Sequence, residues 1–198
     1  NYYLSQLNEN DINRVKDVEA DESLLVLLNR WLERMPFTEN QHYWKEKGAD
    51  SFWQIYDKAY ADSLSENEIS NLGNYHKLFT EKETYPEGRS FSRAANKSAL
   101  FIMLYRDNPM LHLPFELVSS LLEIDELMSM WRHRHIHMVQ RTIGKRVGTG
   151  GSSGADYLKS AADSHYIFKE MAELTSFLLP RHLLPELPQE LQSDLGYR

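Results

Sequence analysis

The 198-residue sequence contains no cysteine. Without thiols the chain can form no disulfide framework, no thiolate metal site and no covalent cofactor attachment of the Cys-x-x-Cys-His type. A reducing compartment, the cytoplasm, fits this composition, and it is the location that we expect.

Excess positive charge and long apolar runs are also missing. The 22 Lys and Arg residues against 29 Asp and Glu residues give a formal net charge of −7, and no basic block is present that could follow a phosphate backbone. The longest apolar stretch, residues 99–105, is far shorter than the roughly 18 residues of a membrane span, and the first residues have no signal-peptide pattern. We therefore expect neither a nucleic-acid partner nor a membrane partner.

What the sequence does contain is a helical apolar period. Hydrophobic residues make up 41% of the chain and aromatic residues 12%, enough for a real core in a domain that buries roughly 70% of its unfolded surface. Apolar positions recur at spacings of three and four, with no extended strand alternation and no internal repeat. The predicted fold class is all-α, a helical bundle with one long central helix.

Four helices are predicted before the long one. The first has Asp21 as its N-cap and stops before Pro36, and the third opens with a capping box formed by Ser65 and Glu68. We expect Gly73, residues 86–88 and Pro109 to separate the elements. The four helices cover residues 24–32, 52–60, 65–79 and 92–107.

A fifth, long helix carries a stripe that includes a histidine. His135 lies within this stripe, whereas His133 and His137 are displaced from it by about 200° at 100° per residue. The geometry therefore distinguishes one histidine of three. The apolar stripe consists of Leu117, Leu121, Ile124, Met128, Trp131, His135 and Met138, and we expect it to be buried.

Two interpretations of His135 follow from its position. Spacing alone favours a core histidine whose ring nitrogens bond to backbone or hydroxyl groups. A neutral imidazole among Leu, Met and Trp side chains is also suited to be an axial haem ligand. His133 and His137, on the other side of the helix, have the spacing of a divalent-metal pair, but neighbouring arginines and the lack of a third ligand favour solvated or interface histidines.

A glycine-serine loop, residues 148–154 (GTGGSSG), follows the long helix. It lacks the lysine of a phosphate-binding loop and does not follow a strand, so it is either a flexible connector or a segment whose backbone closely approaches a ligand.

Trp131-Arg132-x-x-His135 followed by this loop resembles the haem-dependent tryptophan 2,3-dioxygenases. Similarity continues through other segments in the same order, with only a loose likeness over residues 39–87. The similar segments are residues 31–36, 92–94, 104–106, 113–117, 124–125 and 179–182.

The resemblance implies an enzyme that opens the indole ring of L-tryptophan with O₂ to give N-formylkynurenine, the first step of tryptophan breakdown by the kynurenine pathway. It implies that haem b is the cofactor, with His135 as axial ligand of the haem iron and Trp131 in the proximal haem pocket. Thr149, with Gly148 and Gly150, is implied to bind the substrate. The family also implies a homotetramer.

Trp31, Arg34 and Pro36 have two interpretations. In some members of the family this segment helps to form a second, non-catalytic tryptophan site. The alternative is a plain helix end, with Trp31 in the core and Arg34 at the C-terminal helix dipole.

Parts of the family pattern are not found here. The segments that supply a distal histidine and a carboxylate-binding arginine are missing, and Arg93 is not assigned that role. No catalytic residue is therefore assigned within the chain. Residue 1 is Asn, so we expect an internal piece of a longer protein, complemented by an N-terminal segment.

The predicted organisation is a single all-α domain over residues 1–198, or the C-terminal portion of one. Residues 20–84 form its less diagnostic helical segment, and residues 91–182 hold the haem and the substrate loop. Two other functions stay open: a related haem-dependent oxygenase or hydroxylase of another indole or phenol, and a non-enzymatic helical interaction module.

Overall fold

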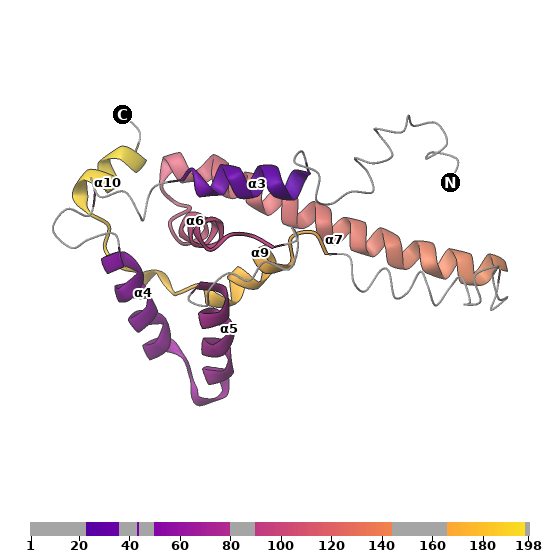
Figure 1. The fold of residues 1–198 in the computed structure, drawn as a ribbon, viewed down its shortest axis with the longest axis horizontal. Coiled ribbons are helices and arrows are strands. Elements are labelled where there is room, and N and C mark those ends of the chain that lie inside the picture. Colours follow the sequence, from indigo (N-terminus) through magenta and orange to yellow (C-terminus); the bar gives the residue numbers. More distant parts are fainter. Residues whose placement is uncertain (1–22, 36–42, 44–49, 80–89, 144–165, 197–198) are drawn as a thin grey trace. The chain divides into compact units, whose positions relative to one another are not determined.

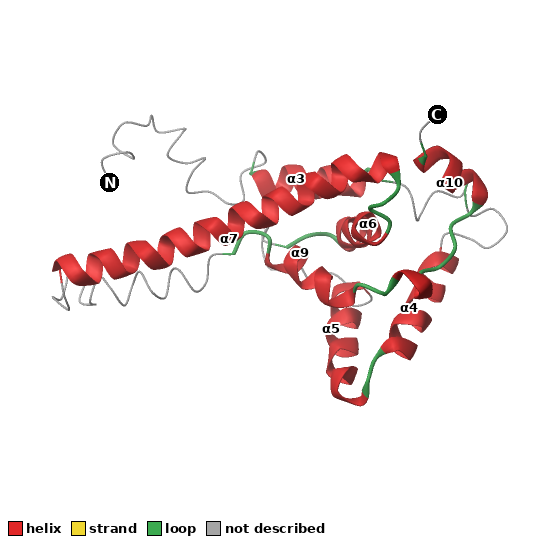
Figure 2. Ribbon diagram, turned by 180° about the vertical axis from the view of Figure 1, so that it is seen from behind, coloured by secondary structure: helices red, strands yellow, loops and turns green. Residues whose placement is uncertain are grey.

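The computed structural model describes residues 23–35, 43, 50–79, 90–143 and 166–196 (Figure 1). These residues form α-helices and short 3-10 helices and contain no strand, as Figure 2 shows. The all-α prediction is therefore confirmed. The chain divides into two compact units, Asn1–Glu116 with Glu170–Arg198 (the first unit) and Leu117–Lys169 (the second unit).

All four helices predicted before the long one are present in the first unit. The unit also contains the C-terminal helices and three 3-10 turns. The α-helices are α3 (Leu24–Glu33), α4 (Asp50–Ser63), α5 (Ile69–Phe79), α6 (Arg93–Leu104), α9 (Lys169–Glu173, which begins at the boundary of the unit) and α10 (Gln189–Leu195). The 3-10 turns are η1 (Glu66–Glu68), η2 (Leu174–Phe177) and η3 (Arg181–Leu183).

Side-chain caps fix where these helices begin. The N-cap of α3 is Ser23, whose hydroxyl accepts a hydrogen bond from the Val26 N–H at 3.3 Å, so the prediction of Asp21 was wrong. Ser92 caps α6 in the same way, accepting from the Ala95 N–H at 3.1 Å. Both serines have extended backbone angles, which places the hydroxyl over the first turn.

The predicted capping box is confirmed, but the predicted break at Gly73 is not. The Glu68 carboxylate accepts a hydrogen bond from the Ser65 N–H at 3.0 Å, and its hydrogen bonds from Ser65 lower the pKa of Glu68. Gly73 lies inside α5, which continues through it. A single glycine costs a helix only about 1 kcal/mol relative to alanine, which the buried side chains of α5, Tyr75 and Phe79, can offset.

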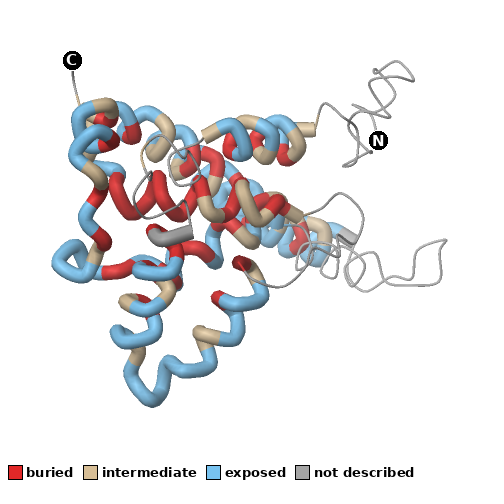
Figure 3. The backbone as a smooth tube through the Cα atoms, turned by 60° about the vertical axis from the view of Figure 1, so that its left-hand side comes forward, coloured by how far each residue is buried: buried red, intermediate tan, exposed pale blue. Residues whose placement is uncertain are grey.

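Helix α6 forms the centre of the first unit. It is buried almost all round, including every residue from Ser98 to Leu104, and α3, α5 and η2 pack against it (Figure 3). A helix that is apolar on all sides is stable only when neighbours cover it completely. The two polar side chains in its interior, Asn96 and Ser98, are also buried, and the Ser98 hydroxyl donates to the Met35 carbonyl at 3.2 Å.

A cluster of aromatic side chains joins the α4–α5 hairpin to η2. The Tyr60 and Tyr75 rings stack with centroids 4.9 Å apart, and Phe177 meets both rings edge-on. Each hydroxyl has an acceptor: Tyr56 donates to the Phe177 carbonyl and Tyr75 donates to the Asp57 carboxylate. Burial is the main cause that raises the pKa of both phenols.

The C-terminal residues are bound to the same unit. The Tyr105 hydroxyl, at the end of α6, donates to the Pro185 carbonyl at 2.6 Å, and Arg181 pairs with Asp107. Further along, Leu191 and Leu195 of α10 are buried. The first unit is therefore built from both ends of the chain.

The long helix is α7, which runs over 35 residues from Pro109 to Ile143. Its length confirms the predicted long helix, and Pro109 begins it at the position where a missing N–H is harmless. The helix also contains Pro114, near its start. No helix in the described ranges is both long and apolar enough to cross a membrane.

Candidate functional site

His135 lies on α7 in the second unit and is partly exposed. The Trp131 ring, one turn earlier, stacks on the imidazole with centroids 5.3 Å apart and planes 14° apart. No hydrogen bond to the His135 ring is formed within the described part of the chain. Among the described residues, the core-histidine interpretation therefore lacks the ring partners that it requires.

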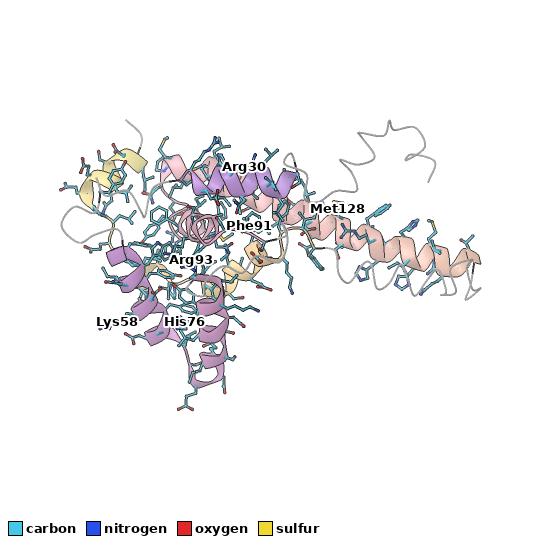
Figure 4. All side chains as sticks on the ribbon, in the orientation of Figure 1. Arg30, Lys58, His76, Phe91, Arg93 and Met128 are labelled. Atoms are coloured by element: carbon cyan, nitrogen blue, oxygen red, sulfur yellow. The ribbon has the colours of Figure 1, made fainter. Side chains whose placement is uncertain are left out.

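The apolar stripe around His135 is exposed, which corrects the prediction that it is buried. Only Leu121 in the stripe is buried, and Trp131 is 63% exposed. Figure 4 draws the side chains of this helix, with Met128 labelled. The exposed members are Leu117, Ile124, Met128, Trp131 and Met138.

A different face of α7 is the buried one. Its buried positions in the second unit are Val118, Leu121, Asp125, Ser129 and Ile136. Two of these five are polar, and they bind a segment that returns to the helix at residues 166–168. Apolar periodicity alone missed this face, because two of its members are polar: Asp125 accepts hydrogen bonds from backbone N–H groups of the returning segment, and Ser129 donates to the Tyr166 hydroxyl.

An exposed row of large apolar side chains is a candidate binding surface. The methionine thioethers and the Trp131 indole can make dispersion contacts with a flat apolar group. The partly exposed His135 imidazole can supply one nitrogen ligand to it. This donor set fits haem, which needs an apolar cradle and an axial ligand, and not a hydrated divalent ion.

The neighbouring histidines have a different setting. His133 and His137 are exposed, and the His133 Nδ1 lies 2.9 Å from the Ser129 carbonyl oxygen. Across the described ranges, no three His, Cys, Asp or Glu side chains come together as a metal site. The separation of His135 from its two neighbours, predicted from helical spacing, is thus present in the structure.

The other predicted site residues lie partly outside the described ranges. Gly148, Thr149 and Gly150 fall within residues 144–165, and Pro36 also lies outside. Trp31 is half-buried on α3, and exposed Arg34 is the C-cap residue of that helix, with its N–H bonded to the Trp31 carbonyl at 3.2 Å. The structure brings these two residues to one helix end.

A contact that the sequence analysis missed lies on α7 before His135. The Asp125 carboxylate accepts hydrogen bonds from two successive backbone N–H groups, and the Ser129 hydroxyl bonds to Tyr166. The available signal was the spacing of four residues between Asp125 and Ser129, which puts both on one face of α7.

The structure defines an all-α protein with a partly exposed histidine beside exposed apolar side chains on a long helix. The family model for tryptophan 2,3-dioxygenase matches residues 1–178, and the chain belongs to the tryptophan 2,3-dioxygenase family.

Individual members of the family cover nearly the whole chain. A tryptophan 2,3-dioxygenase of Dictyostelium discoideum is 36% identical over 99% of this chain and 54% of its own length. One of Alteromonas mediterranea is 34% identical over 98% of this chain and 59% of its own length. One of Xenopus laevis is 37% identical over 89% of this chain and 48% of its own length. The chain therefore spans about half the length of these relatives.

Proposed function

We propose that this chain is the histidine-bearing part of a haem-dependent tryptophan 2,3-dioxygenase. The observation that carries the proposal is His135: a half-exposed imidazole without a hydrogen-bond partner among the described residues, stacked by Trp131 on an exposed apolar stripe. Membership of the family supports the same reaction.

In this proposal the His135 imidazole would hold the iron of haem b, and Trp131 with the Met side chains of the apolar stripe would line the same side of the cofactor. Haem would supply the iron chemistry that activates O₂. The stacked Trp131 ring limits rotation of the imidazole, so the ligand nitrogen keeps one direction. The apolar stripe excludes water from that side of the porphyrin.

The proposed reaction adds both atoms of O₂ across the C2–C3 bond of the indole of L-tryptophan. That bond breaks, two carbonyl groups form, and the product is N-formylkynurenine, with no external electrons consumed. No catalytic side chain is assigned within the chain, whose contribution is to bind and orient. A homotetramer and a cytoplasmic location belong to the same proposal.

Thr149 is the proposed substrate contact, flanked by Gly148 and Gly150. Its hydroxyl would bond to a charged end of the amino acid, an interaction of about 1.5–3 kcal/mol. Thr149→Ala should then lower kcat/KM for tryptophan by roughly 10- to 150-fold with unchanged haem content. Steady-state kinetics measures kcat/KM, and the Soret absorbance measures the haem content. An unaltered kcat/KM would place Thr149 outside the site.

A second tryptophan site at Trp31, Arg34 and Pro36 is also part of the proposal. Its support is the placement of an indole and a guanidinium at the same end of α3. Tryptophan bound at such a site stabilises the protein without being turned over, so added tryptophan should raise the Tm of the wild-type protein. The rise in Tm should be lost in Arg34→Ala.

The decisive experiment supplies the full-length protein with haem, O₂ and L-tryptophan. We expect an intense Soret band and N-formylkynurenine as the product. A Soret band with a different oxidised indole or phenol would indicate a related aromatic oxygenase, and the absence of any haem band would leave a helical interaction module.

A further inference from the structure

Two exposed arginines of α7 lie along one edge of the apolar stripe, beside His135. Arg134 and Arg141 are seven residues apart, so they lie on one side of the helix, about 10 Å from each other along its axis. At 100° per residue, Arg134 is rotated by about 100° from His135, and Arg141 is rotated by about 120° in the same direction. We call this side of the stripe the arginine edge.

The opposite edge of the stripe is covered. Asp125 and Ser129 are rotated from His135 by about 80° and 120° in the other direction, and they are only 3% and 4% exposed. Both bind the segment that returns to the helix at residues 166–168. Because a charged group loses its solvation when it is buried, the carboxylates of a ligand on His135 are best placed at the arginine edge. The apolar rim of such a ligand can lie toward the covered edge.

The charge along this side of α7 changes sign before His135. Glu123 is exposed and lies within about 20° of the direction of Arg134, roughly 16 Å earlier along the helix axis. An anion is therefore repelled near Glu123 and attracted beside His135. Within the described part of the chain, Arg134 and Arg141 form no ion pair with each other's neighbours or with Glu123.

We propose that Arg134 and Arg141 bind the two propionate carboxylates of haem. The proposal rests on the proposed function and deepens it: the surface recognises a flat apolar dianion and not a neutral porphyrin. A planar guanidinium suits this task because it donates two parallel hydrogen bonds to one carboxylate. The two arginines also select one rotation of the macrocycle about the bond to His135, which a single axial ligand leaves free.

The rate at which cofactor leaves the loaded full-length protein tests the arginine contacts without any activity. The two probes are haem and haem dimethyl ester, which keeps the iron and the ring but lacks both carboxylates. Loss of each probe to an excess of apo-globin is followed by the Soret absorbance. The ester should leave the wild-type protein about tenfold or more faster than haem, because it lacks the charge-assisted hydrogen bonds.

Substitution of the arginines should remove this preference. Arg134→Gln and Arg141→Gln should each speed the loss of haem by about three- to tenfold, and leave the loss of the ester unchanged. Arg134→Lys and Arg141→Lys keep the charge without the paired donors and should restore part of the retention. Arg106→Gln is the matched control: it removes an equal charge beside Phe115, near the start of α7, and should change neither rate.

The proposal and the proposed function fail in different ways. Equal rates for haem and its ester in the wild-type protein would overturn the role of the arginines and leave His135 as the haem ligand. Faster loss of both probes from the Gln variants would also overturn it, since only a general weakening of the site would then be seen. A full-length protein that takes up neither probe would overturn the proposed function itself.

Discussion

Tyr56, Tyr75 and Tyr105 hold their protons more tightly in the folded chain than free tyrosine does. Burial raises the pKa of all three phenols, and the hydrogen bond from Tyr75 to Asp57 raises its pKa further. A raised folded pKa contributes stability that is complete below the unfolded pKa of about 10 and is lost as pH rises above it.

The chain should therefore unfold in alkali. Above about pH 10 each of the three tyrosines should remove about 1.4 kcal/mol of folding free energy per pH unit, since the unfolded state releases the proton first. Denaturant unfolding at several pH values, with tyrosinate absorbance as a second probe, measures the effect. Titration of all tyrosines at the ordinary pKa without loss of stability would contradict it.

Part of the candidate site was predictable from sequence, because helical spacing alone determines which residues of one helix share a face. Spacing separated His135 from His133 and His137, and the structure also stacks Trp131 on it. The contacts of Asp125 with the Ile167 and Phe168 N–H groups could not be predicted in this way. Acceptor and donors are 42 and 43 positions apart, and backbone N–H groups leave no trace in residue type.

Among the helices, α5 has a replaceable weak point at Gly73. A Cβ built there meets no atom within 4 Å, and the residue is exposed in the helix interior. Gly73→Ala should therefore stabilise the protein by about 0.5–1 kcal/mol, because alanine loses less backbone entropy on folding. Thermal unfolding gives the change, and a lower Tm would indicate that the glycine has a conformational role that its helical surroundings do not show.

Helix ends and helix faces differed in how far the sequence determined them. Ser92, Ser65 and Pro109 mark helix starts by local chemistry, and the structure has helical turns beginning directly after or at these residues. The exposure of the apolar stripe on α7 was not predictable, since periodicity shows which residues share a face but not what covers it. Asp21 was mistaken for the cap that Ser23 forms, because Asp and Ser are both favoured N-cap residues and the two positions are only two residues apart.

For the whole molecule, the fact of largest consequence is that the chain spans about half the length of its relatives. A substrate carboxylate in a water-poor pocket needs a cation, and no arginine is assigned to that task here. We expect residues 1–198 alone, supplied with haem, to have negligible tryptophan-cleaving activity and to aggregate through the exposed apolar stripe.

Supplying the part of a full-length relative that this chain does not cover, as a separate chain, should restore turnover and solubility. Product formation by residues 1–198 at the rate of the full-length protein would mean that a complete active site lies within them. Light scattering at matched concentrations checks the aggregation separately from the activity.

The central claim is that His135 is the axial ligand of haem, and removal of its side chain with chemical rescue tests it most directly. In the full-length protein His135→Gly should lose the haem spectrum and regain it with added imidazole, whereas His133→Gly and His137→Gly should keep the wild-type spectrum throughout. A wild-type Soret band in His135→Gly without imidazole would contradict the account.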